Sequence, residues 1–119
     1  MASINDSLKS IMAIDGALCC ALVDSNSGML LGHAGAGIDM ELAAAGNTEV
    51  VRAKMRTMES LNLRDSIDDI LITLGKQYHI IRPSISHAGL FFYVVLDKAR
   101  ANLALTRRKV QEVESGVKL

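Results

Sequence analysis

Two segments, residues 17–23 and residues 90–96, constrain the fold most, because each is apolar or aromatic throughout and only as long as a strand. A run of this length without polar alternation is typical of a strand whose two faces are both covered. A sheet that contains two such strands needs helices on both of its sides. We therefore expect a layered structure with the sheet in the middle.

The first of these strands is predicted to lie between a short helix and a hairpin turn. Ser3 is suited to cap the helix, with Asp6 three residues later, and Gly16 is expected to end it. A dense turn signal over residues 24–28 predicts a hairpin, whose returning strand is expected over residues 29–31. The apolar stripe of the helix comprises Ile4, Leu8, Ile11 and Met12.

A long helix is predicted from Met40 to about Leu61, after a glycine-rich break over residues 33–37. At 1.5 Å per residue it would be about 33 Å long, which exceeds what its own half of a small domain requires. Residues 43–46, Ala-Ala-Ala-Gly, would let another backbone approach closely. That backbone could belong to the chain's own sheet or to another molecule, and the sequence favours neither.

Strands are expected over residues 67–74, 77–82 and 90–96, with Pro83 ending the second of them and Asp97 capping a last helix. The side chains expected to pack beneath that helix are Ala99, Leu103, Thr106, Val110 and Val113. Its solvated side chains are expected to be Arg107, Arg108, Lys109 and Glu112. This order predicts an α+β fold, a three-layer α/β/α sandwich around one five-stranded, mainly antiparallel sheet. The long helix is expected on one face and the two terminal helices on the other.

The composition limits the classes of protein to which the chain can belong. Its 119 residues suit one domain, expected over residues 1–119, and 50% hydrophobic residues exclude intrinsic disorder. Thirteen Lys and Arg balance thirteen Asp and Glu, so the positive charge typical of nucleic-acid binding is absent, and weak repulsion fits an oligomer. No run approaches the roughly 20 apolar residues that span a bilayer, and no basic region precedes the first apolar residues. We expect a cytoplasmic protein without membrane insertion.

Neither the cysteines nor the glycine-rich segment predicts a cofactor or metal site. The adjacent Cys19 and Cys20 would face opposite sides of a strand, so we expect two reduced, buried thiols. Residues 32–37, Gly-His-Ala-Gly-Ala-Gly, lack the Lys and Ser/Thr of a phosphate-binding loop, and Met40 replaces the third glycine of the dinucleotide fingerprint. This segment is therefore interpreted as a connection between a strand and a helix, and no cofactor is expected.

No catalytic constellation is visible either, so we expect a protein that is not an enzyme. His33, His79 and His87 lie on separate segments, and His79 is interpreted as a partly buried, hydrogen-bonded residue. The adjacent Asp68 and Asp69 would face opposite sides of a strand and form no acid–base pair. An enzyme would require His79 or His87 to meet a carboxylate in a substrate cleft.

The third predicted strand gives the best physical indication of association. If it lies at the sheet edge, residues 68–73 expose unpaired backbone groups with no proline to guard them. Pairing with its own copy about a two-fold axis would extend the sheet and bring two long helices side by side. Methionine suits adaptable interfaces, and Met40, Met55 and Met58 lie on this helix, although core filling is the simpler explanation for any one of them.

Several segments in this order resemble the Roadblock family, the dynein light-chain roadblock type that is also widespread in bacteria and archaea. The segments that carry the resemblance are residues 21–31 of the first hairpin, residues 78–83 (Tyr-His-Ile-Ile-Arg-Pro) and the stretch from Leu96 and Asp97 to residues 101–107. Their order and spacing cover essentially the whole chain. The resemblance implies a profilin-like sandwich that dimerises, with the third strands paired into one sheet and the long helices antiparallel.

The same resemblance implies a function, because its members are generally not enzymes. They bind Ras-like small GTPases and regulate their nucleotide state or location, or they act as adaptors in motor and signalling complexes. The expected partners are therefore a second copy or a paralogue, and a Ras-like small GTPase. The interface residues carried over are Met40, Ala43, Ala44, Asn47, Val51, Lys54, Met55, Ile70 and Ile72.

A small-molecule-binding sensor module of profilin-like fold is the alternative function. Sheets of this kind, flanked by helices, can hold a ligand in a cavity lined by aromatic side chains and a few polar groups. The aromatic side chains that could contribute are Tyr78, Phe91, Phe92 and Tyr93. Because these are few for a ligand cavity, the composition favours the regulator over the sensor.

Overall fold

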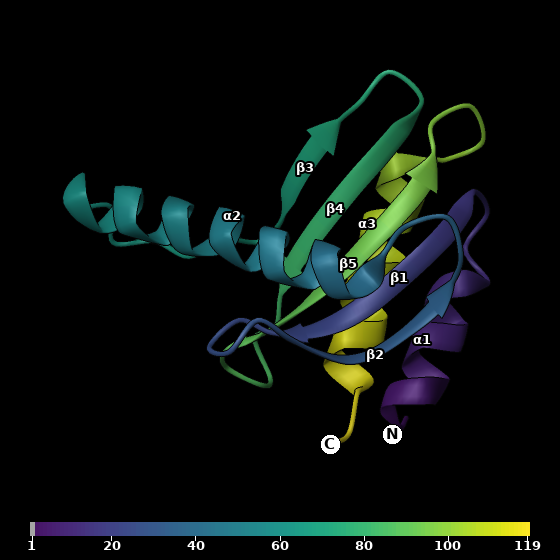
Figure 1. Cartoon of the computed structure of the whole chain (residues 1–119), viewed down its shortest axis with the longest axis horizontal. Coiled ribbons are helices and arrows are strands. Elements are labelled where there is room, and N and C mark those ends of the chain that lie inside the picture. Colours follow the sequence, from purple (N-terminus) through teal and green to yellow (C-terminus); the bar gives the residue numbers. More distant parts are fainter. Residues whose placement is uncertain (1) are drawn as a thin grey trace.

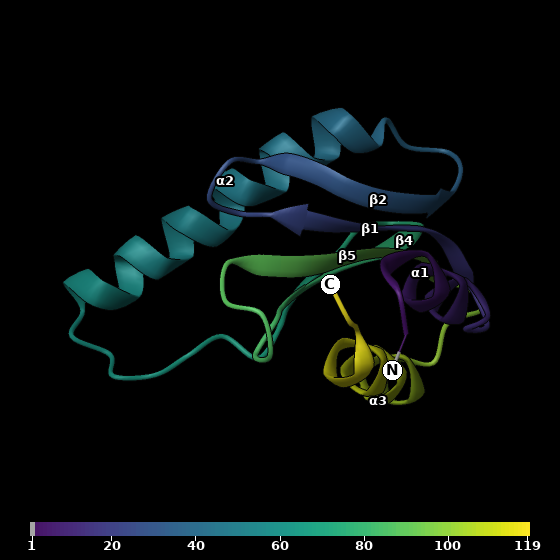
Figure 2. The same ribbon diagram turned by 90° about the horizontal axis from the view of Figure 1, so that it is seen from below.

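Five strands form one sheet in the order β2-β1-β5-β4-β3, and each neighbouring pair is antiparallel (Figure 1). The structure is a computed structural model that describes residues 2–119. Its elements are α1 (Ile4–Met12), β1 (Ala17–Asp24), β2 (Met29–Gly35), α2 (Met40–Ser60), β3 (Ile70–Thr73), β4 (Gln77–Pro83), β5 (Leu90–Asp97) and α3 (Leu103–Gly116). Helix α2 covers one face of the sheet, and α1 and α3 cover the other (Figure 2). The predicted three-layer α/β/α sandwich is confirmed.

The side chains of β1 alternate between two cores. Cys19, Ala21 and Val23 pack beneath α2, whereas Cys20 and Leu22 pack beneath α1 and α3. Both environments are apolar, so every position of the strand gains from an apolar side chain, at about 25 cal/mol per Å² removed from water. This double coverage explains why the sequence of the strand does not alternate between polar and apolar residues.

The two cysteines are free and buried on opposite faces of the sheet, as predicted. Burial raises the pKa of Cys19, and it is the main cause that raises the pKa of Cys20 to about 12. Both side chains are therefore protonated thiols at neutral pH. A buried, protonated thiol is a poor nucleophile, so these residues serve as small core side chains.

The predicted starts of α1 and α2 are confirmed by their caps. The side chain of Ser3 accepts a first-turn N–H of α1 at 3.1 Å, and that of Asp39 accepts one of α2 at 3.2 Å. Helix α1 ends at Met12 rather than near Gly16, which lies in the turn before β1 with a φ of +89°. None of the helices within residues 2–119 combines the length and the apolarity needed to cross a bilayer.

Strand β2 runs to Gly35, four residues beyond the predicted end, because β1 continues to pair with it. Cys19 lies opposite Gly35 in the register, so the glycine-rich segment adds to the sheet instead of leaving it as a loop. Gly35 has a φ of +82°, and an added Cβ would collide with the backbone of Leu18 and Cys19. Glycine at this position therefore permits a close approach of the two strands.

Strand β3 is shorter than predicted, with the four residues Ile70–Thr73 in place of residues 67–74. The carboxylate of Asp69 accepts hydrogen bonds from Arg107 of α3, on the face opposite α2, and the chain before it does not join the ladder. At the other end, the N–H of Leu74 donates to the carbonyl of Gln77 and closes the turn to β4.

Helix α3 begins at Leu103, and its cap is Asn102 rather than the predicted Asp97. The carbonyl of Asp97 accepts the N–H groups of Arg100 and Ala101 and so closes a separate turn. The side chain of Asn102 then accepts a first-turn N–H of α3 at 3.1 Å. The expected packing face is confirmed at Thr106 and Val110, which are buried, and at Leu103 and Val113, which are half-buried, whereas Ala99 is exposed and precedes the helix.

We expect Gly35→Ala to destabilise the protein by about 2 kcal/mol more than Gly37→Ala, because only the former adds a clash. Both glycines have a positive φ, so both substitutions strain the backbone, but an added Cβ at Gly37 meets nothing within 4 Å. Urea denaturation of the two variants and the wild type measures the difference. Equal losses of stability would contradict the close approach at Gly35.

Candidate interaction surface

Strand β3 forms one edge of the sheet, so one side of its backbone lacks a strand partner within residues 2–119. The bond from the N–H of Leu74 to the carbonyl of Gln77, at 2.8 Å, fixes the hydrogen-bonding phase of the β3–β4 pair. Because bonded and non-bonded pairs alternate along an antiparallel ladder, the N–H groups of Leu71 and Thr73 point away from β4. This free edge therefore offers donors and acceptors at Leu71 and Thr73.

The second half of α2 projects beyond the sheet (Figure 1). Residues 52–60, which we call the overhang, include no buried residue, and only Arg52 and Met58 are half-buried. Arg52 ties the start of the overhang to the β1–β2 turn, because its guanidinium donates to the carbonyl of Asn26 at 2.6 Å. Most helical stability in proteins comes from packing, and the overhang has little of it within the chain.

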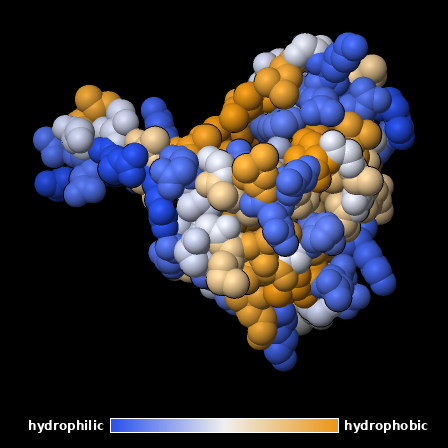
Figure 3. Space-filling model, viewed as in Figure 1, coloured by the Kyte–Doolittle hydropathy of each residue, from blue (hydrophilic) through white to orange (hydrophobic). Residues whose placement is uncertain are grey.

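A groove of about 520 Å³ separates the overhang from the chain that leads into β3. Val50, Lys54 and Met58 of α2 line one side, and Leu63 with residues 65–70 line the other. Leu63 is 50% exposed here, and a hydrophobic band follows the β3 edge in the space-filling view (Figure 3). Contiguous exposed apolar surface of this kind marks interaction sites in soluble proteins.

The nine predicted interface residues fall into three groups. Met40, Ala44 and Val51 face the chain's own sheet and are at most 6% exposed, so the core occupies their side chains. Lys54 and Met55 are exposed on the overhang. The half-buried members are Ala43, Asn47, Ile70 and Ile72. The groove brings Lys54 and Ile70 together, and the assignment of the set to an interface stays a prediction.

The small residues 43–46 lie partly against the sheet and partly on the exposed side of α2. Ala44 is buried against the sheet, so close approach by the chain's own strands accounts for that position. Ala45 and Gly46 are exposed, and an added Cβ at Gly46 would meet nothing within 4 Å. The outer side of α2 is therefore unusually narrow at these two residues.

A polar network lies on the sheet face that α2 covers only in part. Nε2 of His79 lies 2.9 Å from Oε1 of Gln77, and Nδ1 lies 2.9 Å from the hydroxyl of Tyr93, whose ring contacts the imidazole edge to face. Burial lowers the pKa of His79. Burial also raises the pKa of Tyr93, and a hydrogen bond with the side chain of Asn47 of α2 partly offsets that rise. His79 is thus a partly buried, hydrogen-bonded residue, as predicted.

Within the described part of the chain, no hydrogen bond or ion pair joins a histidine to a carboxylate. The ring partners of His79 are Gln77 and Tyr93, and Nε2 of His87 lies 3.0 Å from the carbonyl of Val117. Among residues 2–119, no three side chains of His, Cys, Asp or Glu gather as potential metal ligands.

Glu114 of α3 is a buried carboxylate that the sequence analysis missed. It is 2% exposed, and its Oε1 accepts hydrogen bonds from both hydroxyls and backbone N–H groups of the loop at Ser84, Ile85 and Ser86, at 2.7–3.1 Å. Burial alone would raise the pKa of Glu114, but these hydrogen bonds together hold it below its ordinary value. The helical period could have found it, because Glu114 lies four residues after the buried Val110.

An ion pair that the sequence analysis also missed joins α3 to the start of β3. Nε of Arg107 donates to Oδ2 of Asp69 at 2.9 Å, and Nη2 donates to Oδ1 at 3.2 Å. Arg107 was expected to be solvated, and its side chain is 44% exposed, but its head group is engaged. No local pattern signals this contact, because the two residues are separated by 38 positions.

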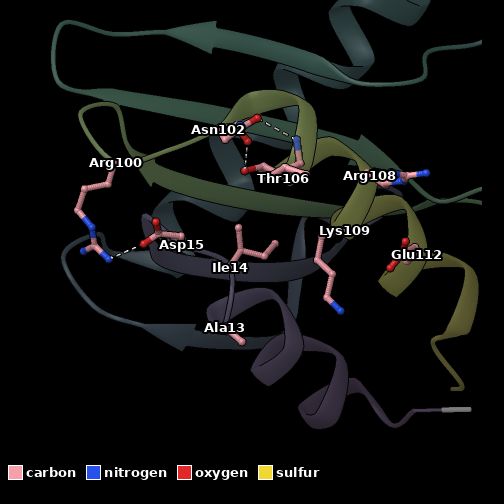
Figure 4. Close-up of a pocket in the computed structure, with 10 residues that line it drawn as sticks. Ala13, Ile14, Asp15, Arg100, Asn102, Thr106, Arg108, Lys109 and Glu112 are labelled. Carbon is pink, nitrogen blue, oxygen red and sulfur yellow. Dashed lines mark hydrogen bonds and ion pairs between the residues drawn. The ribbon is translucent and has the colours of Figure 1, made fainter.

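A second cleft, of about 650 Å³, lies between the turn after α1, residues 13–15, and α3, on the opposite side of the sheet (Figure 4). The ion pair from Arg100 to Asp15, at 2.9 Å, borders it at one end, and Lys109 of α3 points into it. Ile14 and Leu105 supply apolar lining. This cleft is open to solvent, and none of the described residues that line it is aromatic.

No protein-family model and no curated protein sequence matches the chain. Solved structures nevertheless share its fold. Myxococcus xanthus MglB has a TM-score of 0.83 at 20% identity, over 94% of this chain and 89% of that one. A Roadblock/LC7 domain from Streptomyces avermitilis has a TM-score of 0.78 at 9% identity, over 90% and 87%. A structure described as MglB with a tetrameric arrangement has a TM-score of 0.73 at 11% identity, over 94% and 88%.

The chain therefore has the Roadblock/LC7 fold, and the family resemblance is confirmed at the level of the fold. The shared fold covers 90–94% of this chain and 87–89% of these solved chains.

We expect Glu114→Gln to lower the free energy of unfolding by about 1–3 kcal/mol at pH 7, because an amide is a weaker acceptor for the loop. Since folding lowers the pKa of Glu114, its stabilisation is complete above the ordinary carboxyl pKa of 4.5 and is lost as the pH falls through the folded-state value. Urea denaturation from pH 7 to about pH 3 should show a constant difference above pH 4.5, and the difference should shrink as the pH falls below that value. Glu112→Gln, on the exposed side of α3, is the control and should change little.

Proposed function

We propose that this chain is a non-enzymatic regulator or scaffold that self-associates through β3 and α2 and binds a Ras-like small GTPase. The observation that carries the proposal is the proximity of a free sheet edge and a helix half with no core beneath it. A free edge exposes backbone groups, and an unpacked helix half contributes little stability of its own. A second copy would satisfy both at once.

The free edge suits antiparallel pairing about a two-fold axis at Ile72. In that register, Leu71 of each copy would lie opposite Thr73 of the other, and these are the residues whose N–H groups point outward. The result would be one continuous sheet across both copies. A contact of this kind is self-complementary, which is the usual form of a homodimer interface.

The same axis would place the overhang of each copy over the sheet face of the other. Met55 and Lys54 are exposed on the overhang, while Ile72 and His79 are half-buried on the sheet face near the edge. Covering them would bury apolar surface that the single chain leaves in water. The solved MglB with a tetrameric arrangement is consistent with self-association in this fold. A paralogue with a compatible edge could replace the second copy.

The GTPase partner is proposed from the Roadblock resemblance together with the fold shared with MglB and a Roadblock/LC7 domain. The absence of a histidine–carboxylate pair within residues 2–119 leaves binding as the activity that the surfaces support. We propose that residues 1–119 act as one Roadblock-like domain in the cytoplasm. Regulation would then follow from different affinities for the two nucleotide states of the GTPase.

The alternative, a sensor for a small molecule, is less well supported. Ligand pockets are usually concave and rich in aromatic lining. Among the described residues, no aromatic side chain lines the groove beside the overhang or the cleft between residues 13–15 and α3. Phe91, Phe92 and Tyr93 are buried in the two cores instead.

We expect Thr73→Pro to convert a dimer to a monomer, because proline removes an outward-facing N–H and blocks the partner strand. The pairing of β3 with β4 should survive, since proline is tolerated where the N–H of an edge strand faces solvent. Light scattering over a range of concentrations measures the mass of the variant and of the wild type.

Thr73→Val is the matched control, because it keeps the backbone donor and a β-branched side chain, and it should stay dimeric. Met55→Glu should also weaken the dimer, whereas Leu105→Glu, at a residue of similar exposure on α3, should not. A wild-type chain that is monomeric at every concentration would refute the proposed self-association.

We expect the purified dimer to bind a Ras-like small GTPase from the same genome, with about a tenfold preference for one nucleotide state, a typical coupling between two sites. Calorimetric titrations against the GTPase loaded with GDP or with a non-hydrolysable GTP analogue measure both affinities. Failure to bind each such GTPase in both states would refute the partner and leave self-association as a separate result.

A further inference from the structure

The ion pair between Arg107 and Asp69 has the geometry of an orienting contact. Its two parallel hydrogen bonds, of 2.9 Å and 3.2 Å, engage Nε and Nη2 of one guanidinium with both oxygens of one carboxylate. The Asp69 side chain is 15% exposed, so water competes with the guanidinium less than at an open surface. A planar, two-point contact fixes direction as well as distance.

The position of this pair is more informative than its strength. Asp69 is the last residue before β3, and residues 64–68 before it form neither helix nor strand. Among the described residues, Arg107 makes the only side-chain hydrogen bonds that join residues 64–69 to another element. The contact therefore anchors an irregular segment at the point where it enters the free edge.

We infer that Arg107 is a positioning residue for self-association, acting through Asp69 to hold the β3 edge ready for a second copy. The inference rests on the proposed pairing of two β3 strands. A strand of four residues that follows an irregular segment frays easily, and ordering it during association would subtract from the affinity. Anchoring Asp69 beforehand raises the fraction of chains whose edge can pair. Because both copies of a dimer need an ordered edge, the apparent affinity rises with the square of that fraction.

The test compares dimer dissociation constants by sedimentation equilibrium. Arg107→Ala and Asp69→Asn should each raise the constant about tenfold, the order expected when a charge-assisted contact is lost. The exchanged pair, Asp69→Arg with Arg107→Asp, should recover much of the affinity. Arg100→Ala is the matched control, because it breaks an arginine–aspartate pair of similar length at Asp15 and should leave the constant unchanged.

Hydrogen exchange separates positioning from general stability. In monomer at high dilution, Arg107→Ala should speed exchange at the amides of Ile70 and Ile72, which the register bonds to β4, and leave the amides of β1 and β5 unchanged. At the same dilution, the thermal unfolding midpoint of the monomeric variant should stay near that of the monomeric wild type. Equal acceleration throughout the sheet, with a matching loss of thermal stability, would overturn the positioning role.

Two failures are distinguishable. A wild-type chain that never dimerises overturns the pairing of β3 strands and the role of Arg107 with it. A wild-type dimer whose affinity is unchanged in Arg107→Ala, or whose affinity is not recovered by the exchanged pair, overturns the role of Arg107 alone.

Discussion

The burial of β1 and β5 on both faces is the constraint on which the rest of the structure depends. Two central strands without a polar face require a helical layer on each side, and three helices supply it. Helix α2 alone covers one face, and it packs on the sheet through buried residues of its first half, Met40, Ala44 and Val51. The length left over after Val51 is what projects beyond the sheet as the overhang.

This arrangement makes the two edges of the sheet, at β2 and at β3, different in how they are covered. At β2, helix α1 crosses so closely that a Cβ at Gly32 would lie 2.9 Å from Ile4. At β3, the edge is bare on the side of the overhang and anchored on the other side by Arg107. The ion pair thus joins α3, on one face of the sheet, to the start of β3, which α2 leaves uncovered on the other face.

The elements that the sequence predicts well are those whose signals are local. The period of α2 and the apolar runs of β1 and β5 give their type and nearly their limits, because each depends on the chain's immediate neighbours. The end of β2 at Gly35 and the short length of β3 depend on how far the neighbouring strands, β1 and β4, continue to pair with them. No local pattern carries that information.

The candidate surface was predicted in outline and not in detail. The long helix followed from the spacing of its apolar residues, and an exposed third strand was expected only on the condition that it lay at the sheet edge, where the structure places it. The inward face of α2 was not separable from its outward face. Met40, Ala44 and Val51 therefore entered the predicted interface although they pack on the chain's own sheet. Arg107 with Asp69, and Glu114 with its loop, are contacts between distant segments, which only the fold brings together.

The irregularity in β2 bears on how large an assembly this chain can form. The register passes from Gly32 to Leu30 across adjacent residues of β1, so Leu31 is an extra residue that bends the outer edge. A regular strand at β2, together with an edge at β3 that can pair, would allow copies to add at both edges of the sheet without limit. If two copies pair through β3 as proposed, the disrupted edge at β2 would stop growth at a closed pair instead of allowing a fibre.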